Sequence, residues 1–393
     1  MPYRKGIAAL LTGRGLSALG DQLTGIAIAL WVLETTGSAL MAGLSYAVKI
    51  APVVVLAPWA GWLVDRYDKR LLFIASHLGS VVTAGGLLLA VGLESFPGLL
   101  AAMALGKAAT TISLPSAQAV LKHGAPSDSQ RGLVVTSSTI SGVNQVVGPL
   151  VGALLYQGAG IVVVLWCDLL SFAVCAATGF LLAPLPGNPA LPRPLQAGRE
   201  TVRRVVEDPV LSRVISAEAA YFLLFGATDI LGLVLLNDAL GGGAAGPFFA
   251  ASGAGALLTS FVIGRGSWSG HALLRTAALG CAPLAVLTVL LVGLHPAAAA
   301  VVGALDGCVH TLIIVGAAMI YQTESGGEEI GRVFALRRML VNGCFSLSYL
   351  LWPGVADLFG TGFAMVVAGG LTTLVLAWML LLRRTDPVRS AAS

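Results

Sequence analysis

The chain has 393 residues, of which 56% are hydrophobic and only 11% are charged, and its mean hydropathy is +0.88. Soluble globular proteins carry about 25% charged and about 45–50% apolar residues, so this composition excludes an ordinary soluble protein. It also excludes intrinsic disorder, which needs few apolar residues and much charge. The formal net charge of +4 comes without a Lys/Arg-rich surface domain, so we expect no nucleic-acid partner. The composition indicates a polytopic protein of the lipid bilayer.

Twelve apolar segments follow one another along the chain. Lipid cannot satisfy exposed backbone N–H and C=O groups, so apolar runs of about 20 residues must be helical where they cross a membrane. The sequence therefore predicts an all-α membrane protein with twelve transmembrane helices. The segments are 7–34, 39–64, 71–93, 97–122, 131–157, 160–182, 210–237, 246–265, 272–294, 297–322, 329–356 and 360–382.

Lysine and arginine gather in the loops on one side of these segments. They lie near residues 4–5, 66–70, 122–131, 193–213, 265–275, 332–338 and 383–389, and the loops on the other side carry none. Because basic loops stay in the cytoplasm, this pattern predicts that both termini are cytoplasmic. A bacterial inner (plasma) membrane is the expected location.

The linker 184–209 is rich in proline and then in charge, and it divides the segments into two sets of six. We expect two pseudo-symmetric six-helix halves, 1–183 and 210–393, with a central cavity near the middle of the bilayer. The five cysteines form no CxxC pair, so no metal is expected. No phosphate-binding loop or catalytic constellation is present either, so neither a cofactor nor enzymatic activity is expected.

The loop between the second and third segments reads GWLVDRYDKR over residues 61–70. It resembles the G-x-x-x-D-R-x-G-R-R/K loop of the major facilitator superfamily, with Asp68 in place of the second glycine. The resemblance implies the major facilitator fold and a cytoplasmic gate in which Gly61, Asp65, Arg66, Lys69 and Arg70 take part. A plain basic loop at the inner membrane surface is the alternative.

The fifth segment contains a second motif, Asn144, Gly148, Pro149 and Gly152. It resembles in part the glycine- and proline-rich element of antiporters in that superfamily, and small residues of this kind let helices pack closely. Residues 19–22, 34–39, 114–120 and 168–172 resemble the branch that contains macrolide-efflux proteins and enterobactin exporters. Ordinary packing of small residues is the alternative explanation for the motif in the fifth segment.

Charged side chains within the segments are candidates for proton coupling or for lining a cavity, because charges inside a membrane usually face a partner or a cavity. These candidates are Asp21, Lys49, Lys107, Asp168, Asp229, Asp306 and His310. Asp21 is the leading proton carrier, paired with Lys49 or Lys107. The alternative is a set of purely structural ion pairs.

These observations predict a secondary active transporter that exports a small organic molecule, drug-like or siderophore-like, by alternating access. The resemblance implies proton antiport, so the expected partners are a small-molecule substrate and protons, and the protein is expected to be a monomer. A proton symporter or facilitator for a nutrient or a lysophospholipid is the alternative.

Overall fold

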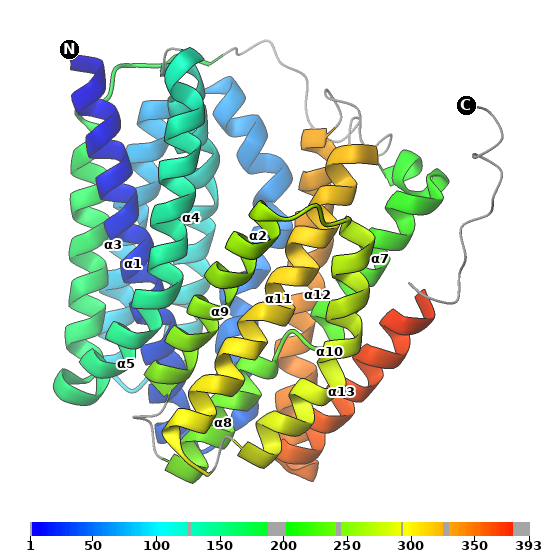
Figure 1. Cartoon of the computed structure of the whole chain (residues 1–393). Helices are drawn as coiled ribbons and strands as arrows, with labels where there is room; N and C mark the ends of the chain where they lie inside the picture. The colour runs from blue at the N-terminus through cyan, green and yellow to red at the C-terminus, as the bar shows by residue number, and fades with distance from the viewer. Residues whose placement is uncertain are drawn as a thin grey trace, which may run out of the picture.

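The computed structural model describes residues 2–124, 127–187, 202–240, 245–291, 294–324 and 330–379, and within them it is helical with no strand. The chain begins at one end of the bundle, called here the N-terminal face, which is at the top of Figure 1. The end at which α1 stops is called the opposite face. The helices are α1 (Pro2–Thr36), α2 (Ala39–Arg66), α3 (Lys69–Gly92), α4 (Phe96–Gly124), α5 (Ser127–Gly179), α7 (Pro209–Leu224), α8 (Thr228–Leu240), α9 (Ala245–Arg265), α10 (Gly270–Leu291), α11 (Pro296–Glu324), α12 (Ile330–Phe359) and α13 (Thr361–Ala377).

The described residues contain ten helical stretches that are long and apolar enough to cross a membrane, and α13 is a further apolar helix of 17 residues. Helix α5 covers two of the expected segments. Its backbone turns where they meet, at Gly160, where φ is +78°. An L-residue with a side chain rarely adopts this left-handed conformation, whereas glycine adopts it freely. The protein is thus an all-α integral membrane protein, and each predicted apolar segment is largely helical in its described residues, with a break in the segment 210–237.

The segment 210–237 is one stretch long enough to cross a membrane, as predicted, but it consists of two helices rather than one. The segment breaks between α7 and α8, and groups from α12 satisfy backbone atoms at the break. The indole N–H of Trp352 donates to the carbonyl of Leu223 at 3.1 Å, and the N–H of Ala227 donates to the hydroxyl of Ser348 at 3.0 Å. A break inside a membrane is tolerated when neighbouring helices bind the freed groups in this way.

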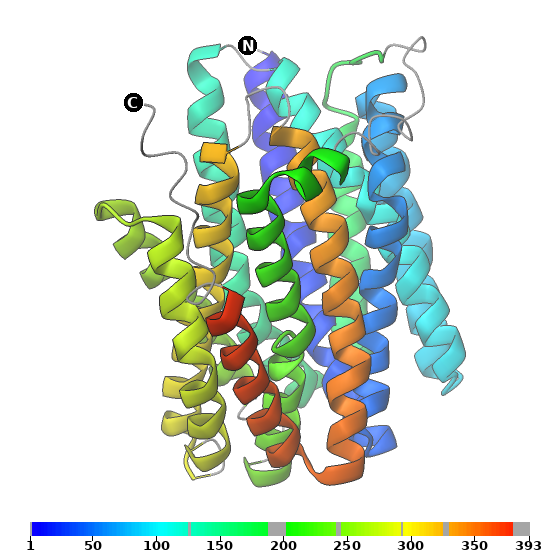
Figure 2. The ribbon, with the colours of Figure 1, turned by 90° about the vertical axis from the view of Figure 1, so that its right-hand side faces the viewer.

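The helices form two groups that lie side by side (Figures 1 and 2). The first helix group is α1–α5 and the second is α7–α13, and most packing occurs within a group. The groups meet chiefly where α2 packs on α12 and α5 packs on α9. The domain bounds stay a prediction, and residues 188–201 of the linker lie outside the described residues.

Near the opposite face the two groups are in direct contact along α2 and α12. A Cβ on Gly43 would lie 2.1 Å from the carbonyl oxygen of Tyr349, so the backbones approach as closely as glycine allows. The rings of Tyr46 and Tyr349 lie 5.1 Å apart between their centroids, and the Ser346 hydroxyl donates to the carbonyl of Ala47 at 2.9 Å. One buried hydrophobic cluster also crosses from the first group into the second.

Asp357 makes the contact between α2 and α12 that lies nearest the opposite face. Its carboxylate accepts the Ser38 hydroxyl at 2.7 Å and the backbone N–H groups of Ala39 and Leu40 at 3.0 and 3.1 Å. The first N–H groups of a helix have no partner within the helix and carry partial positive charge. A carboxylate from α12 therefore caps the N-terminus of α2 and joins the two groups at the opposite face.

Candidate substrate cavity

A cavity of about 170 Å³ lies between the first helix group and α12. Its walls come from α1, α2, α3, α4 and α12, and they carry more charge than is usual inside a membrane protein. Arg14 and Asp21 come from α1, Lys107 from α4 and Arg338 from α12, and the buried imidazole of His77 completes this set. Val53 of α2 and Arg338 of α12 line the cavity. The contacts between these two helices described above lie closer to the opposite face than Val53 and Arg338 do.

A smaller cavity of about 40 Å³ adjoins the first and shares Asp21 and Lys107 with it. Lys49 and Asp168 also line it. The rest of its wall is largely apolar and includes Ile28, Leu87, Met103 and Phe172. The structure therefore brings together four of the seven charged candidates named from the sequence, namely Asp21, Lys49, Lys107 and Asp168.

The expected ion pair between Asp21 and Lys49 or Lys107 is not formed in this structure. The Lys49 ammonium instead donates to the backbone carbonyl of Asp21 at 3.4 Å. Among the described residues, no lysine nitrogen lies within the 4.0 Å ion-pair distance of the Asp21 carboxylate. The Asp21 side chain therefore lines both cavities, and its carboxylate has no ion-pair partner among the described residues.

Asp168 is the most deeply buried of these acids, with 3% of its surface exposed. One carboxylate oxygen accepts the Thr24 hydroxyl at 2.9 Å, and the other is buried without a hydrogen-bond partner among the described residues. Burying a carboxylate without a cation or enough donors costs far more than burying the neutral acid. This environment suits a carboxyl group that carries a proton.

Asp229, Asp306 and His310 lie in the second helix group and line neither cavity. Asp229 accepts the Tyr349 hydroxyl at 2.6 Å in the first turn of α8. The Ser252 hydroxyl donates to Asp306 at 3.4 Å, and His310 Nδ1 lies 3.1 Å from the Tyr221 hydroxyl. These three polar groups are thus held by other side chains of their own group.

The loop with the gate motif is bound to the start of the linker. The Asp68 carboxylate caps α3 by accepting the N–H of Leu71 at 3.0 Å, and it also accepts the N–H of Leu185 at 2.9 Å. Lys69 is buried, and its ammonium donates to the carbonyl of Pro186 at 3.2 Å. The residue that departs from the superfamily pattern, Asp68, therefore attaches the linker to this loop.

The remaining gate residues make fewer contacts. The Arg70 guanidinium donates to the carbonyl of Phe180 at 3.2 Å, and that of Arg66 lies 5.1 Å from the ring centroid of Trp62. The Asp65 side chain is exposed and has no hydrogen bond or ion pair with other described residues. A Cβ on Gly61 would meet no described atom within 4 Å, so no close approach between the described helices depends on this glycine.

The motif in the fifth segment packs α5 against α1. A Cβ on Gly148 would lie 2.5 Å from Cβ of Gln22, and one on Gly152 would lie 2.6 Å from the Ile26 side chain. The Asn144 amide donates to the carbonyl of Gly15 at 2.8 Å, while Pro149 lies within the same helix. These small residues permit the close approach that the sequence predicted.

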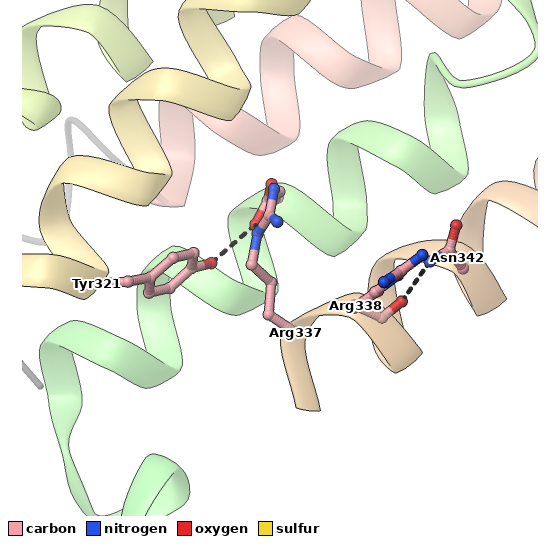
Figure 3. A network of polar contacts seen from close by, with 5 residues as sticks. Tyr321, Arg337, Arg338 and Asn342 are labelled. Atoms are coloured by element: carbon pink, nitrogen blue, oxygen red, sulfur yellow. Dashed lines mark hydrogen bonds and ion pairs between the residues drawn. The ribbon is translucent and has the colours of Figure 1, made fainter. Parts of the chain in front are cut away.

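A buried ion pair in the second group was missed from the sequence. Arg337 donates through Nε to one oxygen of Glu218 at 2.7 Å and through a second nitrogen to the other oxygen, and the Tyr321 hydroxyl donates to the same carboxylate at 2.8 Å. Figure 3 shows Arg337 reaching toward Tyr321 while Arg338 lies apart from it beside Asn342.

Counting Arg337 and Arg338 with the loop residues was therefore wrong, because α12 begins at Ile330 and places both about two turns inside the helix. Arg14 and His77 were also absent from the predicted site. The helical spacing between Arg14 and Asp21, seven residues or about two turns, is the signal in the sequence that places both on one face of α1.

Comparison with known proteins agrees with this helical architecture. The sequence profile described as Major Facilitator Superfamily matches residues 10–344. The MFS-type transporter YfiS of Bacillus subtilis is 25% identical over 95% of this chain and 92% of its own length. Macrolide efflux protein A of Streptococcus pyogenes is 25% identical over 42% of each chain.

Among solved structures, the nucleoside transporter NupG superposes with a TM-score of 0.77 at 12% identity, covering 95% of this chain and 99% of NupG. At this identity the likeness concerns the fold alone. The sequence profile, which covers most of the chain, identifies the class of protein as a membrane transporter. The chain belongs to the Major Facilitator Superfamily.

Proposed function

We propose that the protein exports a small organic molecule through the cavity between its helix groups in exchange for protons. The observation that carries the proposal is a polar cavity walled by both groups, with two acidic side chains beside it. Asp21 lines this larger cavity, and Asp168 lines the smaller cavity that adjoins it. The relative named for macrolide efflux favours the outward direction. The N-terminal face is cytoplasmic in this proposal, because the basic loops lie there.

The contacts between α2 and α12 support alternating access. Asp357, Tyr349 and Ser346 join the helix groups toward the opposite face, while the cavity lies on the side of the N-terminal face. Export requires these contacts to break as the groups close on the cytoplasmic side. The protonation states of Asp21 and Asp168 are then available to couple the two conformations, because a carboxyl group gains or loses charge where it is costly to bury.

Transport into inside-out vesicles with an acidic interior tests this mechanism. We expect the wild-type protein to accumulate dansylglycine, a small organic carboxylate, and Asp21→Asn or Asp168→Asn to abolish accumulation while the probe still exchanges without a gradient. Asp238→Asn is the matched control, because Asp238 is exposed near the end of α8 and lines neither cavity. Accumulation at wild-type rates in both cavity variants would contradict the proposed coupling.

Proton-coupled uptake of an organic anion is the second candidate, and the excess of cations in the larger cavity favours it. The two mechanisms move the substrate in opposite directions relative to the protons. In the same vesicles, antiport fills the acidic interior with substrate, whereas symport carries substrate out with the protons. Emptying of preloaded vesicles in response to the pH gradient would identify the symporter.

A further inference from the structure

We infer that the larger cavity binds an organic anion, whose charged group is held by Arg14, Lys107 and Arg338. This inference rests on the proposed function in one respect, namely that the cavity is the site of transport. It concerns the chemical class of the substrate and holds for either direction of movement.

The first step is the charge balance of the cavity. Three permanently or ordinarily positive side chains line it, and Asp21 is the only acid among its lining residues. Among the described residues, no carboxylate oxygen lies within 4.0 Å of the charged nitrogens of Arg14, Lys107 or Arg338. Like charges that share a cavity of low dielectric repel one another, so this arrangement is stabilised by an anion that enters it.

Arg337 shows what a structural arginine looks like in the same helix. Its guanidinium meets both oxygens of Glu218 and has a tyrosine ring beside it. Arg338 is the next residue, yet its side chain has no acidic partner within the described part of the chain, and it lines the cavity. Helix α12 thus carries one arginine for the fold of its own group and one that remains available to a ligand.

The second step is the origin of the three cations. Arg14 and Lys107 belong to α1 and α4 of the first group, and Arg338 belongs to α12 of the second. An anion in the cavity that is held by all three cations would link the first and second helix groups. Binding energy would then favour the conformation in which α12 approaches α1 and α4, which is the movement that alternating access needs.

The third step is the shape of the ligand. The smaller cavity shares Asp21 and Lys107 with the larger one and is walled largely by apolar side chains. An occupant with an anionic end among the cations and an apolar part against Ile28, Leu87 and Met103 fits both cavities. Guanidinium groups match the planar, two-oxygen geometry of a carboxylate, so an organic carboxylate is the class of ligand that these walls favour.

Asp21 modulates this site. Its carboxylate faces the same cavity and would repel a bound anion, so replacing its charge is expected to strengthen binding. Asp21→Asn should bind an anion several-fold more tightly than the wild-type protein, whereas substitutions of the cations should weaken it. These opposite effects separate an electrostatic site from general damage to the cavity.

The test uses two fluorescent probes that differ only in charge, dansylglycine and its neutral amide, titrated against the purified full chain in detergent. We expect the wild-type protein to bind the carboxylate about tenfold more tightly than the amide. Arg338→Gln and Lys107→Gln should each remove most of this preference, because they weaken binding of the carboxylate far more than binding of the amide. Arg265→Gln is the matched control, since Arg265 lies at the end of α9 outside both cavities.

Equal affinities for the two probes, or no binding of dansylglycine up to about 1 mM, would overturn the inference. The outcome is separate from that of the proposed function. Transport of a neutral probe without any preference for the carboxylate removes the anion site alone. Selective binding of dansylglycine without transport of it removes the transport role of the cavity and leaves the anion site standing.

Discussion

Arg337 and Arg338 are adjacent in the chain, yet they meet opposite electrostatic surroundings. Arg337 is 16% exposed in its side chain and is paired with Glu218, whose side chain is fully buried. Arg338 reaches the cavity. A helix turns by about 100° per residue, so neighbouring side chains leave it in different directions, and two identical residues acquire different roles.

Glu218→Gln should destabilise the protein strongly. Breaking a buried ion pair by removing one partner leaves an uncompensated buried charge and costs about 3 kcal/mol or more. The measurement is thermal unfolding of the detergent-solubilised protein. The matched control is Glu207→Gln, because the pair of Arg203 and Glu207 is 79% and 62% exposed and such pairs contribute about 0.5 kcal/mol or less. Similar melting shifts in the two variants would contradict the structural role of Glu218.

Asp68 shows how a departure from a family pattern acquires a local function. A glycine at this position could neither cap α3 nor bind the linker, whereas the Asp68 carboxylate accepts the N–H groups of both Leu71 and Leu185. Compared with a glycine, Asp68 has less backbone freedom in this turn, but it adds two hydrogen bonds.

Asp68→Ala should lower stability by about 1 kcal/mol, the usual cost of losing a side-chain helix cap. Asp68→Asn should retain most of it, since an amide oxygen also accepts hydrogen bonds at a cap. Comparing the unfolding of both variants with the wild type checks the assignment. If the alanine and asparagine variants lost equal stability, the hydrogen bonds of Asp68 could not be the cause.

At the scale of elements, α2 and α12 are joined more closely than any pattern in either helix suggests. Gly43 removes the side chain that would separate them, and Asp357 caps the N-terminus of α2 from the other group. The cap is exposed, so solvent screens it, and a charge at a helix N-terminus contributes about 0.3–1 kcal/mol there. That is enough to bias two conformations of similar free energy.

Asp357→Ala should open the opposite face more often. A loss of about 1 kcal/mol changes a two-state equilibrium about fivefold. A cysteine introduced at the buried Ala47, in a background without the five native cysteines, should then react about fivefold faster with a membrane-impermeant maleimide applied from the opposite face. Asp238→Ala is the control, since it removes another exposed aspartate near that face. Equal labelling rates in the two variants would show that Asp357 does not hold the face closed.

At the scale of the whole molecule, the placement of charge sets the expected orientation in the membrane. The N-terminal face carries the basic loop at 66–70 and the start of α12, while the loops at the opposite face contain no lysine or arginine. Anionic lipid at the cytoplasmic surface favours the basic face there.

Single cysteines at Asn188 and Gly241, again without the native cysteines, should be labelled from opposite sides of the membrane. Asn188 should react only from the cytoplasm, because the linker that contains it begins beside the basic loop at 66–70. Gly241 should react only from outside, because it lies between α8 and α9 in the chain. Labelling of both from one side would contradict the arrangement of helices between them, and an exchange of sides would reverse the orientation.

The helical fold and its family could be predicted from the sequence, because lipid leaves an apolar run of 20 residues no other regular structure. Hydrophobic length located every segment, and glycine spacing at Gly148 and Gly152 predicted the packing of α5. The break between α7 and α8 was not predictable in this way. Trp352 and Ser348 stabilise it from a helix more than 100 residues away, and hydropathy along one segment carries no information about such partners.

The candidate site was predicted only in part. Counting residues from the segment ends predicts Asp21, Lys49 and Lys107 at one depth, and these three do line the cavities. The same count puts Asp229 and Asp306 at that depth, yet they lie in the second helix group and line neither cavity. Which charges pair with which depends on rotation about each helix axis and on the approach of the two groups, and these are set by side-chain packing in three dimensions. The sequence by itself therefore determined the class of protein and the order of its apolar segments. Only the tertiary structure decided that Arg337 pairs with Glu218, that Arg338 lines the cavity and that Asp357 joins the two helix groups, because these contacts depend on how helices far apart in the chain pack together.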